Sequence, residues 1–140
     1  MPLVVDASVV VKWVFPGNDG EANIQQAMAV FQSVRAGKTQ LLQPPHWLAE
    51  VSAVCVRLDA RIAQDAIRFF HAMHVRVADS PEIYSRACKL AQRLDHHLFD
   101  TLYHAVALTI PETLLVTADH RYFRKAKKYG AILSLAEFSA

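Results

Sequence analysis

The stretch Leu3-Val4-Val5-Asp6-Ala7-Ser8-Val9-Val10-Val11-Lys12-Trp13 sets one carboxylate against a largely apolar background near the start of the chain. The apolar, mainly β-branched residues after Pro2 predict a buried strand that Asp6 ends. A carboxylate in such a place costs free energy unless it is solvated, paired or bound to a metal. In open α/β sheets, ligands gather at the carboxyl ends of the strands. We therefore expect Asp6 to lie at a ligand-binding edge.

The size and composition of the chain fit one folded domain. It has 140 residues, of which 53% are hydrophobic, and a chain of this size buries roughly 70% of its unfolded surface. We expect a single domain over residues 1–140. No apolar run approaches the roughly 20 residues that cross a bilayer, and the N-terminal sequence lacks the pattern of a secretion signal. These features predict a cytoplasmic protein with no membrane contact.

Charge and cysteine content exclude some classes of protein. The net charge of +2 is too small to indicate a nucleic-acid binder by itself. Cys55 and Cys88 are far apart, which excludes a disulfide framework and a thiolate metal site. We interpret both as small buried residues inside helices.

Short apolar strands alternate with helical patterns along the chain. After a loop at residues 17–20, strands are predicted at 39–42, 75–77, 114–117 and 131–133, and helices at 21–36, 46–58, 62–73, 81–94, 100–110 and after residue 119. Ser80 is the predicted cap of the helix that Pro81 begins. In the helix at 46–58, the spacing of Trp47, Val51, Val54 and Leu58 predicts a core-facing stripe. The alternation is typical of a parallel sheet covered on both faces by helices.

Carboxylates stand at several places where a solvated charge is not expected. Asp6 and Asp119 both follow predicted strands, whose ends share one edge of a parallel sheet. Glu50 lies beside an apolar stripe, and Asp100 lies in the first turn of a helix. If these acids converge, their mutual repulsion favours a divalent cation with oxygen ligands, Mg²⁺ or Mn²⁺. Such a site suits phosphodiester hydrolysis.

Each acid also has an ordinary structural explanation. Asp6 and Asp119 can cap helices, Asp100 can begin one, and Glu50 can form a surface pair with Arg57. Spacing alone does not bring the acids together.

Neighbouring side chains leave similar alternatives open. Ser8 and Thr117 can bond a metal-bound water or phosphate, or satisfy backbone groups of a turn. A basic cluster after the fourth acid can bind RNA phosphates or form an exposed helix face; it comprises Arg121, Arg124, Lys125, Lys127 and Lys128.

Aromatic and histidine residues receive structural interpretations. Tyr122, Phe123 and Tyr129 are interpreted as core or interface residues rather than base-stacking platforms. His71 and His74 have helical spacing but no third ligand for zinc. His104, one turn after Asp100, is assigned to the core or surface.

Four segments together resemble the acidic motifs of PIN-domain ribonucleases, and most of all the VapC toxins of bacterial toxin–antitoxin pairs. They are Val4–Trp13, Pro44–Glu50, Phe99–Leu108 and Leu115–Asp119. The resemblance covers essentially the whole chain. Family members often carry Asn three positions after the second acid, where this chain has Ala53.

The resemblance implies a three-layer α/β/α sandwich with a mainly parallel central sheet. It also implies a Mg²⁺- or Mn²⁺-dependent endoribonuclease, a homodimer, and a cognate antitoxin that blocks the acidic pocket. The implied catalytic acids are Asp6, Glu50, Asp100 and Asp119. We expect Asp6, Asp100 and Asp119 to hold the metal, with Glu50 a further candidate ligand that orients or deprotonates the attacking water.

Two other classes of function remain as alternatives. A catalytically idle interaction module would keep the fold and the antitoxin contact without turnover. A phosphoryl-accepting receiver domain would need an acidic pair near Asp6 and a lysine after the last strand, and the sequence has neither.

Overall fold

The strands form a parallel sheet in the middle of the molecule. The computed structural model describes residues 1–17 and 22–139. Strands β1 (Leu3–Val5), β4 (Leu114–Thr117) and β5 (Ile132–Ser134) pair in parallel in the order β1-β4-β5. Strands β2 (Leu42–Gln43) and β3 (Arg76–Val77) form a second parallel pair, and a parallel bridge between Leu3 and Leu41 connects the two groups. The spatial order is therefore β3-β2-β1-β4-β5.

A side chain takes the place of backbone pairing between β1 and β2. The Gln43 amide accepts a hydrogen bond from the Val5 N–H through Oε1 and donates one to the Val5 carbonyl through Nε2, both at 2.8 Å. Gln43 is fully buried, so these bonds satisfy backbone groups that water cannot reach. The clamp fixes the end of β1 immediately before Asp6.

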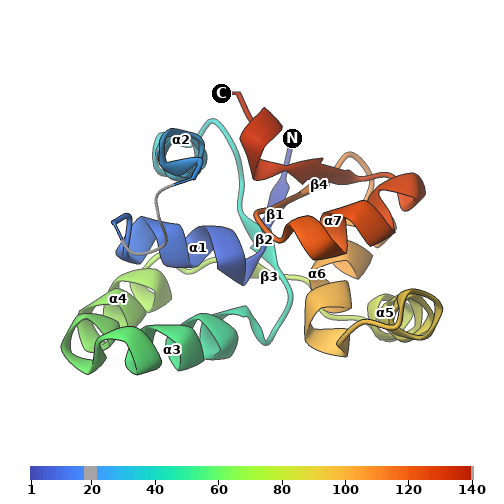
Figure 1. The fold of residues 1–140 in the computed structure, drawn as a ribbon, viewed down its shortest axis with the longest axis horizontal. Helices are drawn as coiled ribbons and strands as arrows, with labels where there is room; N and C mark the ends of the chain where they lie inside the picture. Colours follow the sequence, from blue (N-terminus) through green and yellow to red (C-terminus); the bar gives the residue numbers. More distant parts are fainter. Residues whose placement is uncertain (18–21, 140) are drawn as a thin grey trace.

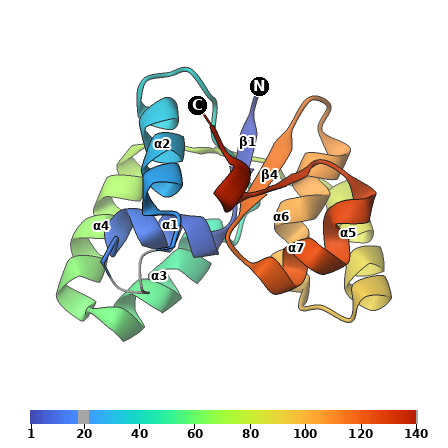
Figure 2. The ribbon, with the colours of Figure 1, turned by 45° about the horizontal axis from the view of Figure 1, so that its top comes forward.

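Helices cover the sheet on two sides. Figures 1 and 2 show α1 to α4 gathered on one side of the strands and α5 to α7 on the other. The helices are α1 (Ala7–Val14), α2 (Ile24–Arg35), α3 (Trp47–Leu58), α4 (Ala60–Ala72), α5 (Pro81–Leu94), α6 (Leu98–Thr109) and α7 (His120–Ala126), with short 3₁₀ turns at Lys127–Tyr129 and Leu135–Glu137. This is the three-layer α/β/α fold with a parallel sheet that the sequence predicted.

The sequence pattern did not predict helix α1, which follows directly after Asp6. Asp6 has extended backbone angles (φ −63°, ψ 151°) and ends the strand as the residue before α1. Its carbonyl accepts from the N–H groups of Val9 and Val10 at 2.9 and 3.2 Å. Both valines are fully buried, so their packing against the core outweighs the strand preference of β-branched residues.

Several predicted boundaries shift for local reasons. The strand predicted at 39–42 lies at Leu42–Gln43, because the Thr39 N–H bonds the Ser33 carbonyl at the end of α2. Helix α6 begins at Leu98 rather than Asp100, because His97 Nδ1 accepts from the Phe99 N–H at 3.0 Å. The last strand begins one residue late, after Ala131 adopts a positive φ of 54°.

Most predicted core faces are confirmed, with two corrections. The Ser80 hydroxyl caps α5 as predicted, at 3.3 Å from the Ile83 N–H. In α3 the buried stripe continues through Cys55, whereas Leu58 at the end of the helix is 40% exposed. Cys88 is exposed rather than buried, because it lies away from the face of α5 that packs on the core.

No helix in the described parts of the chain is long and apolar enough to cross a membrane. Of the predicted loop at 17–20, residues 18–20 lie outside the described residues.

Candidate metal centre

All the predicted acids line one pocket of about 370 Å³ at the carboxyl edge of the sheet. Asp6 follows β1, Asp119 follows β4, and Glu50 and Asp100 come from α3 and α6. The pocket is lined by Asp6, Ala7, Ser8, Val11, Lys12, Glu50, Val54, Asp100, Ala118 and Asp119. One carboxylate oxygen each of Asp6, Glu50 and Asp100 lies within 4.8 Å of the other two, and Asp100 forms a second such group with His96 and Asp119.

Asp6 is the most buried of these acids. Its Oδ2 accepts hydrogen bonds from the Ser8 hydroxyl at 2.6 Å and the Thr117 hydroxyl at 3.0 Å. Its pKa is raised to about 6, chiefly by burial and also by the charges of Asp100 and Asp119, while the two hydroxyls act in the opposite direction. The pocket therefore holds a carboxylate that is costly to ionise.

Glu50 enters the pocket from the first turn of α3. The Tyr103 hydroxyl donates to its Oε1 at 2.8 Å. Burial raises the pKa of Glu50 to about 7, opposed by the Tyr103 hydrogen bond and assisted by the charges of Asp6 and Asp100. A group that titrates near neutral pH can accept or release a proton under physiological conditions.

Asp100 and Asp119 are each held by one side-chain contact among the described residues. His96 Nε2 lies 3.0 Å from Asp100 Oδ2. Asp119 caps α7, because its Oδ1 accepts from the Tyr122 N–H at 3.0 Å. Asp119 therefore both caps α7 and lines the pocket.

Each carboxylate thus has one oxygen anchored by the protein and a second oxygen without a protein partner among the described residues. The anchored atoms are Asp6 Oδ2, Glu50 Oε1, Asp100 Oδ2 and Asp119 Oδ1. Lys12 lines the pocket, but in the described part of the chain no Lys or Arg forms a salt bridge with these acids. Unpaired, partly buried carboxylate oxygens fit a hard divalent cation.

The comparisons with known proteins agree with this geometry. A family model of the PIN domain matches residues 3–129. The chain belongs to the PIN-domain family. A solved structure described as a toxin–antitoxin complex from Klebsiella pneumoniae has a similar fold, with a TM-score of 0.66 and 17% identity over 97% of this chain and 99% of that chain. That likeness concerns the fold alone, and the curated proteins gave no match.

The hydroxyls of this PIN domain join the acids to the backbone. Ser8 Oγ donates to Asp6 and accepts from the Ala118 N–H at 3.1 Å. Thr117 Oγ1 likewise donates to Asp6 and accepts from the Asp119 N–H at 3.0 Å. Both therefore satisfy turn backbone, one of the alternatives considered, and at the same time orient Asp6.

Three residues near the acids were not predicted from the sequence. Lys12 shares a helix face with Ser8, four residues earlier, a signal that only a helix at 7–14 would reveal. Tyr103 contacts Glu50 across 53 residues of sequence, so no local pattern predicts the pair. His96 precedes Asp100 by four residues, but α6 begins between them.

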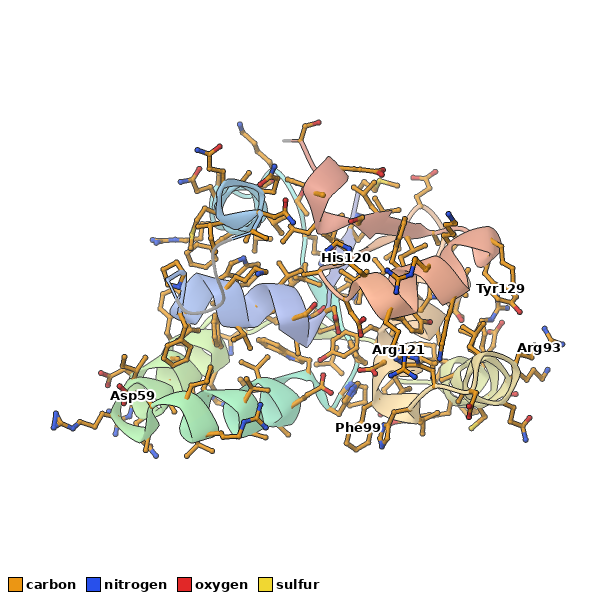
Figure 3. The ribbon with its side chains drawn as sticks, in the orientation of Figure 1. Asp59, Arg93, Phe99, His120, Arg121 and Tyr129 are labelled. Carbon is orange, nitrogen blue, oxygen red and sulfur yellow. The ribbon has the colours of Figure 1, made fainter. Side chains whose placement is uncertain are left out.

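The remaining candidates lie outside the pocket. Among the basic residues, Arg121, Arg124, Lys127 and Lys128 are exposed, whereas Lys125 is half-buried. Arg121, labelled in Figure 3, lies in the first turn of α7, two residues after the capping Asp119. Ala53 is exposed on α3.

The structure confirms Tyr122 and His104 as core residues. Tyr122 is buried, and Phe123 and Tyr129 are half-buried. His104 is fully buried: its Nε2 donates to the Gly130 carbonyl at 2.8 Å and its Nδ1 accepts from the Tyr122 hydroxyl at 2.9 Å. His71 and His74 are both exposed.

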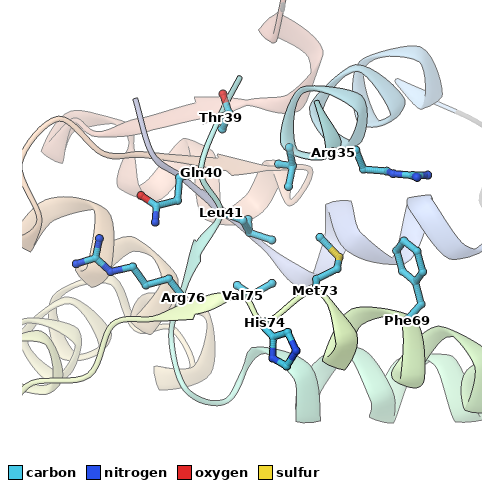
Figure 4. Close-up of a pocket in the computed structure, with 10 residues that line it drawn as sticks. Arg35, Thr39, Gln40, Leu41, Phe69, Met73, His74, Val75 and Arg76 are labelled. Carbon is cyan, nitrogen blue, oxygen red and sulfur yellow. The ribbon is translucent and has the colours of Figure 1, made fainter. Parts of the chain in front are cut away.

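Other hollows lie away from the acids. A pocket of about 460 Å³ lies between the end of α2 and the end of α4, and Figure 4 shows Arg35 and Arg76 at its margin. Arg93 and Tyr129 lie at one end of the molecule (Figure 3) and line a pocket of about 530 Å³ beside α5. Neither contains the acids of the sheet edge.

Proposed function

We propose that this PIN domain is a metal-dependent endoribonuclease that hydrolyses RNA phosphodiester bonds. One observation carries the proposal: the acids at the sheet edge line a single pocket, and oxygens of Asp6, Glu50 and Asp100 lie within 4.8 Å of one another. Carboxylates that close to one another cannot all ionise without a compensating cation. Oxygen ligands favour Mg²⁺ or Mn²⁺ over softer metals.

The residues divide into two roles in this proposal. Asp6, Asp100 and Asp119 would hold the cation through their unanchored oxygens. A bound cation would neutralise charge on the phosphate and lower the pKa of a bound water. Glu50, with a pKa raised to about 7, would orient that water or accept its proton. The Tyr103 hydroxyl holds Glu50 in place for this step.

RNA is the proposed substrate because basic residues lie on the helix that follows Asp119. Arg121 and Arg124 are exposed on α7, the helix that Asp119 caps. Exposed arginines beside a metal site can position successive phosphates of one strand. We propose that this helix face, with Lys127 and Lys128, guides the RNA backbone to the pocket.

We also propose that the protein is the cytoplasmic toxin of a toxin–antitoxin pair. The similar structure from Klebsiella pneumoniae is described as such a complex. The surface of α3 and α4 offers apolar side chains for protein contacts: Val56, Leu58, Ile62 and Phe69 are 40–52% exposed. Such a patch suits a homodimer or an antitoxin. Light scattering of the purified protein, alone and with an antitoxin, would measure both assemblies.

A cleavage assay tests the nuclease proposal. Labelled single-stranded and hairpin RNAs would be incubated with Mg²⁺, with Mn²⁺ and with EDTA. We expect cleavage only with metal, and loss of cleavage in Asp6→Asn and Asp119→Asn. We expect both substitutions to preserve the fold, because Asn keeps an oxygen that can accept the anchoring hydrogen bonds. Asp65→Asn, at an exposed acid on α4, is the matched control and should retain activity.

Two results of this assay would contradict the nuclease proposal or the assigned roles. Absence of metal-dependent product with every RNA would favour the catalytically idle interaction module. Cleavage that persists in Asp6→Asn or Asp119→Asn would refute the assigned roles.

A further inference from the structure

A chain of contacts leads from α7 through the loop before α6 to the acidic pocket. Lys125 Nζ lies 3.2 Å from His96 Nδ1, and His96 Nε2 lies 3.0 Å from Asp100 Oδ2. The imidazole therefore stands between an ammonium group and a carboxylate of the candidate metal centre.

The surroundings hold His96 firmly in this place. Its side chain is only 10% exposed, and its ring packs edge-on against Tyr122 with the centroids 4.9 Å apart. The backbone N–H of His96 donates to the Ala91 carbonyl at 3.1 Å. Lys125 is fixed as well, because Nζ also donates to the Asp95 carbonyl at 3.1 Å.

The ammonium group decides which ring nitrogen carries the hydrogen. A lysine ammonium has three donors and no acceptor. His96 Nδ1 must therefore accept from Lys125, which requires a lone pair on Nδ1. The hydrogen of the ring then lies on Nε2, where it is donated to Asp100 Oδ2.

We propose that Lys125 and His96 form a positioning pair that sets the orientation of Asp100 in the metal centre. Lys125 selects the Nε2–H tautomer, and His96 donates to Asp100 Oδ2, which leaves Oδ1 free to bind a cation. The inference rests on the proposed function in one respect: the oriented carboxylate is taken to be a metal ligand.

This arrangement bears on the kind of metal that the site accepts. The geometric group of His96, Asp100 and Asp119 would also suit a site with a nitrogen ligand. With its hydrogen on Nε2, however, His96 has no lone pair directed at the pocket. The ligands offered to the cation are then carboxylate oxygens, which favours Mg²⁺ or Mn²⁺ over Zn²⁺.

The first test uses the metal-free protein and does not depend on nuclease activity. Long-range ¹H–¹⁵N NMR correlation spectra distinguish the two tautomers of a histidine ring. We expect the Nε2–H form for His96 in the wild-type protein and a mixture of forms in Lys125→Met. An Nδ1–H or doubly protonated ring in the wild type would overturn the proposal, as would an unchanged tautomer in Lys125→Met.

The second test measures Mn²⁺ affinity by calorimetry. Loss of a group that orients a metal ligand typically lowers affinity by about 10- to 100-fold. We expect about a 10-fold loss in His96→Leu and a smaller loss in Lys125→Met. His96→Gln should stay within about 3-fold of wild type, because its amide nitrogen occupies nearly the position of Nε2. Lys89→Met, which removes an exposed lysine on α5, is the control and should bind as the wild type does.

The outcomes separate this inference from the proposed function. Absence of Mn²⁺ binding by the wild type would refute the metal centre, whereas the NMR result would still decide the tautomer. Normal binding by His96→Leu, or equal losses in His96→Leu and His96→Gln, would refute the positioning role. Nitrogen coupling to bound Mn²⁺ in pulsed EPR spectra would show that His96 is itself a ligand and would also refute it.

Discussion

Replacing Asp6 by Asn should stabilise the metal-free protein at alkaline pH. Burial raises the pKa of Asp6 from 3.8 to about 6, and each pKa unit corresponds to about 1.4 kcal/mol. Ionised Asp6 therefore costs the folded state about 3 kcal/mol relative to the unfolded chain. Asn removes the charge and keeps an oxygen that can accept from Ser8 and Thr117. We expect a gain in the free energy of unfolding of up to about 3 kcal/mol at pH 8.

The sign of the pH dependence follows from the direction of the shift. Because the folded protein holds the Asp6 proton more tightly, it binds more protons than the unfolded chain between about pH 4 and pH 6. The stability of the wild-type protein must then fall as pH rises through this range. At pH 4 the gain from Asp6→Asn should shrink to less than about 1 kcal/mol.

Urea unfolding in EDTA from pH 4 to pH 8 measures this difference. Asp65→Asn is the control, because the Asp65 side chain is 85% exposed, and its curve should follow the wild type. Mn²⁺ should reverse the order of stability at pH 8, since a ligand stabilises only the form that binds it. A variant that is no more stable than wild type at pH 8, or a gain that does not change with pH, would show that Asp6 carries no desolvation cost.

Three further predictions concern the contacts around the acids. Tyr103→Phe removes a hydrogen bond that lowers the pKa of Glu50, so the acidic limb of the pH–rate profile for RNA cleavage should move to higher pH; an unmoved limb would argue against Glu50 as the proton acceptor. Gln43→Leu leaves the buried N–H and carbonyl of Val5 unpaired, which should cost about 2–5 kcal/mol in urea unfolding, whereas the exposed Gln64→Leu control should change stability by less than about 0.5 kcal/mol. Affinity for Mn²⁺ should weaken as pH falls from 8 to 5, because protons compete for carboxylates whose pKa values are raised; calorimetry in buffers of different ionisation heat would count the released protons, and an affinity independent of pH would contradict the raised pKa values.

The sequence predicted the position of the acids better than their environment. Asp6 and Asp119 follow strands, and the ends of parallel strands meet at one edge by topology alone. The strand at Leu114–Thr117 was predicted residue for residue, because its apolar run is bounded by Thr113 and Ala118. Strand order and partners such as Tyr103 depend on contacts far apart in sequence, so local patterns could not supply them.

Helix α1 illustrates where propensity misleads. Val9, Val10 and Val11 favour strands in isolation, yet all lie in a helix that is buried on one side. Asp6 ends the strand before this run. Burial of Val9 and Val10 against the core then stabilises the helix. The predictions that Cys88 and Leu58 are buried were wrong for a related reason. Residue type sets a tendency to be buried, but the helix face on which a residue lies decides whether it is buried.

The side-chain clamp of Gln43 divides the sheet at its middle. Strand β2 leads into α3 and so carries Glu50, whereas Asp6 and Asp119 follow β1 and β4. Only the bridge at Leu3 and the Gln43 amide connect the described backbone of β2 to β1. Amide hydrogen exchange at Val5 therefore reports how often the two halves of the sheet part. A cation shared by Glu50 and Asp6 would tie those halves together and slow that exchange.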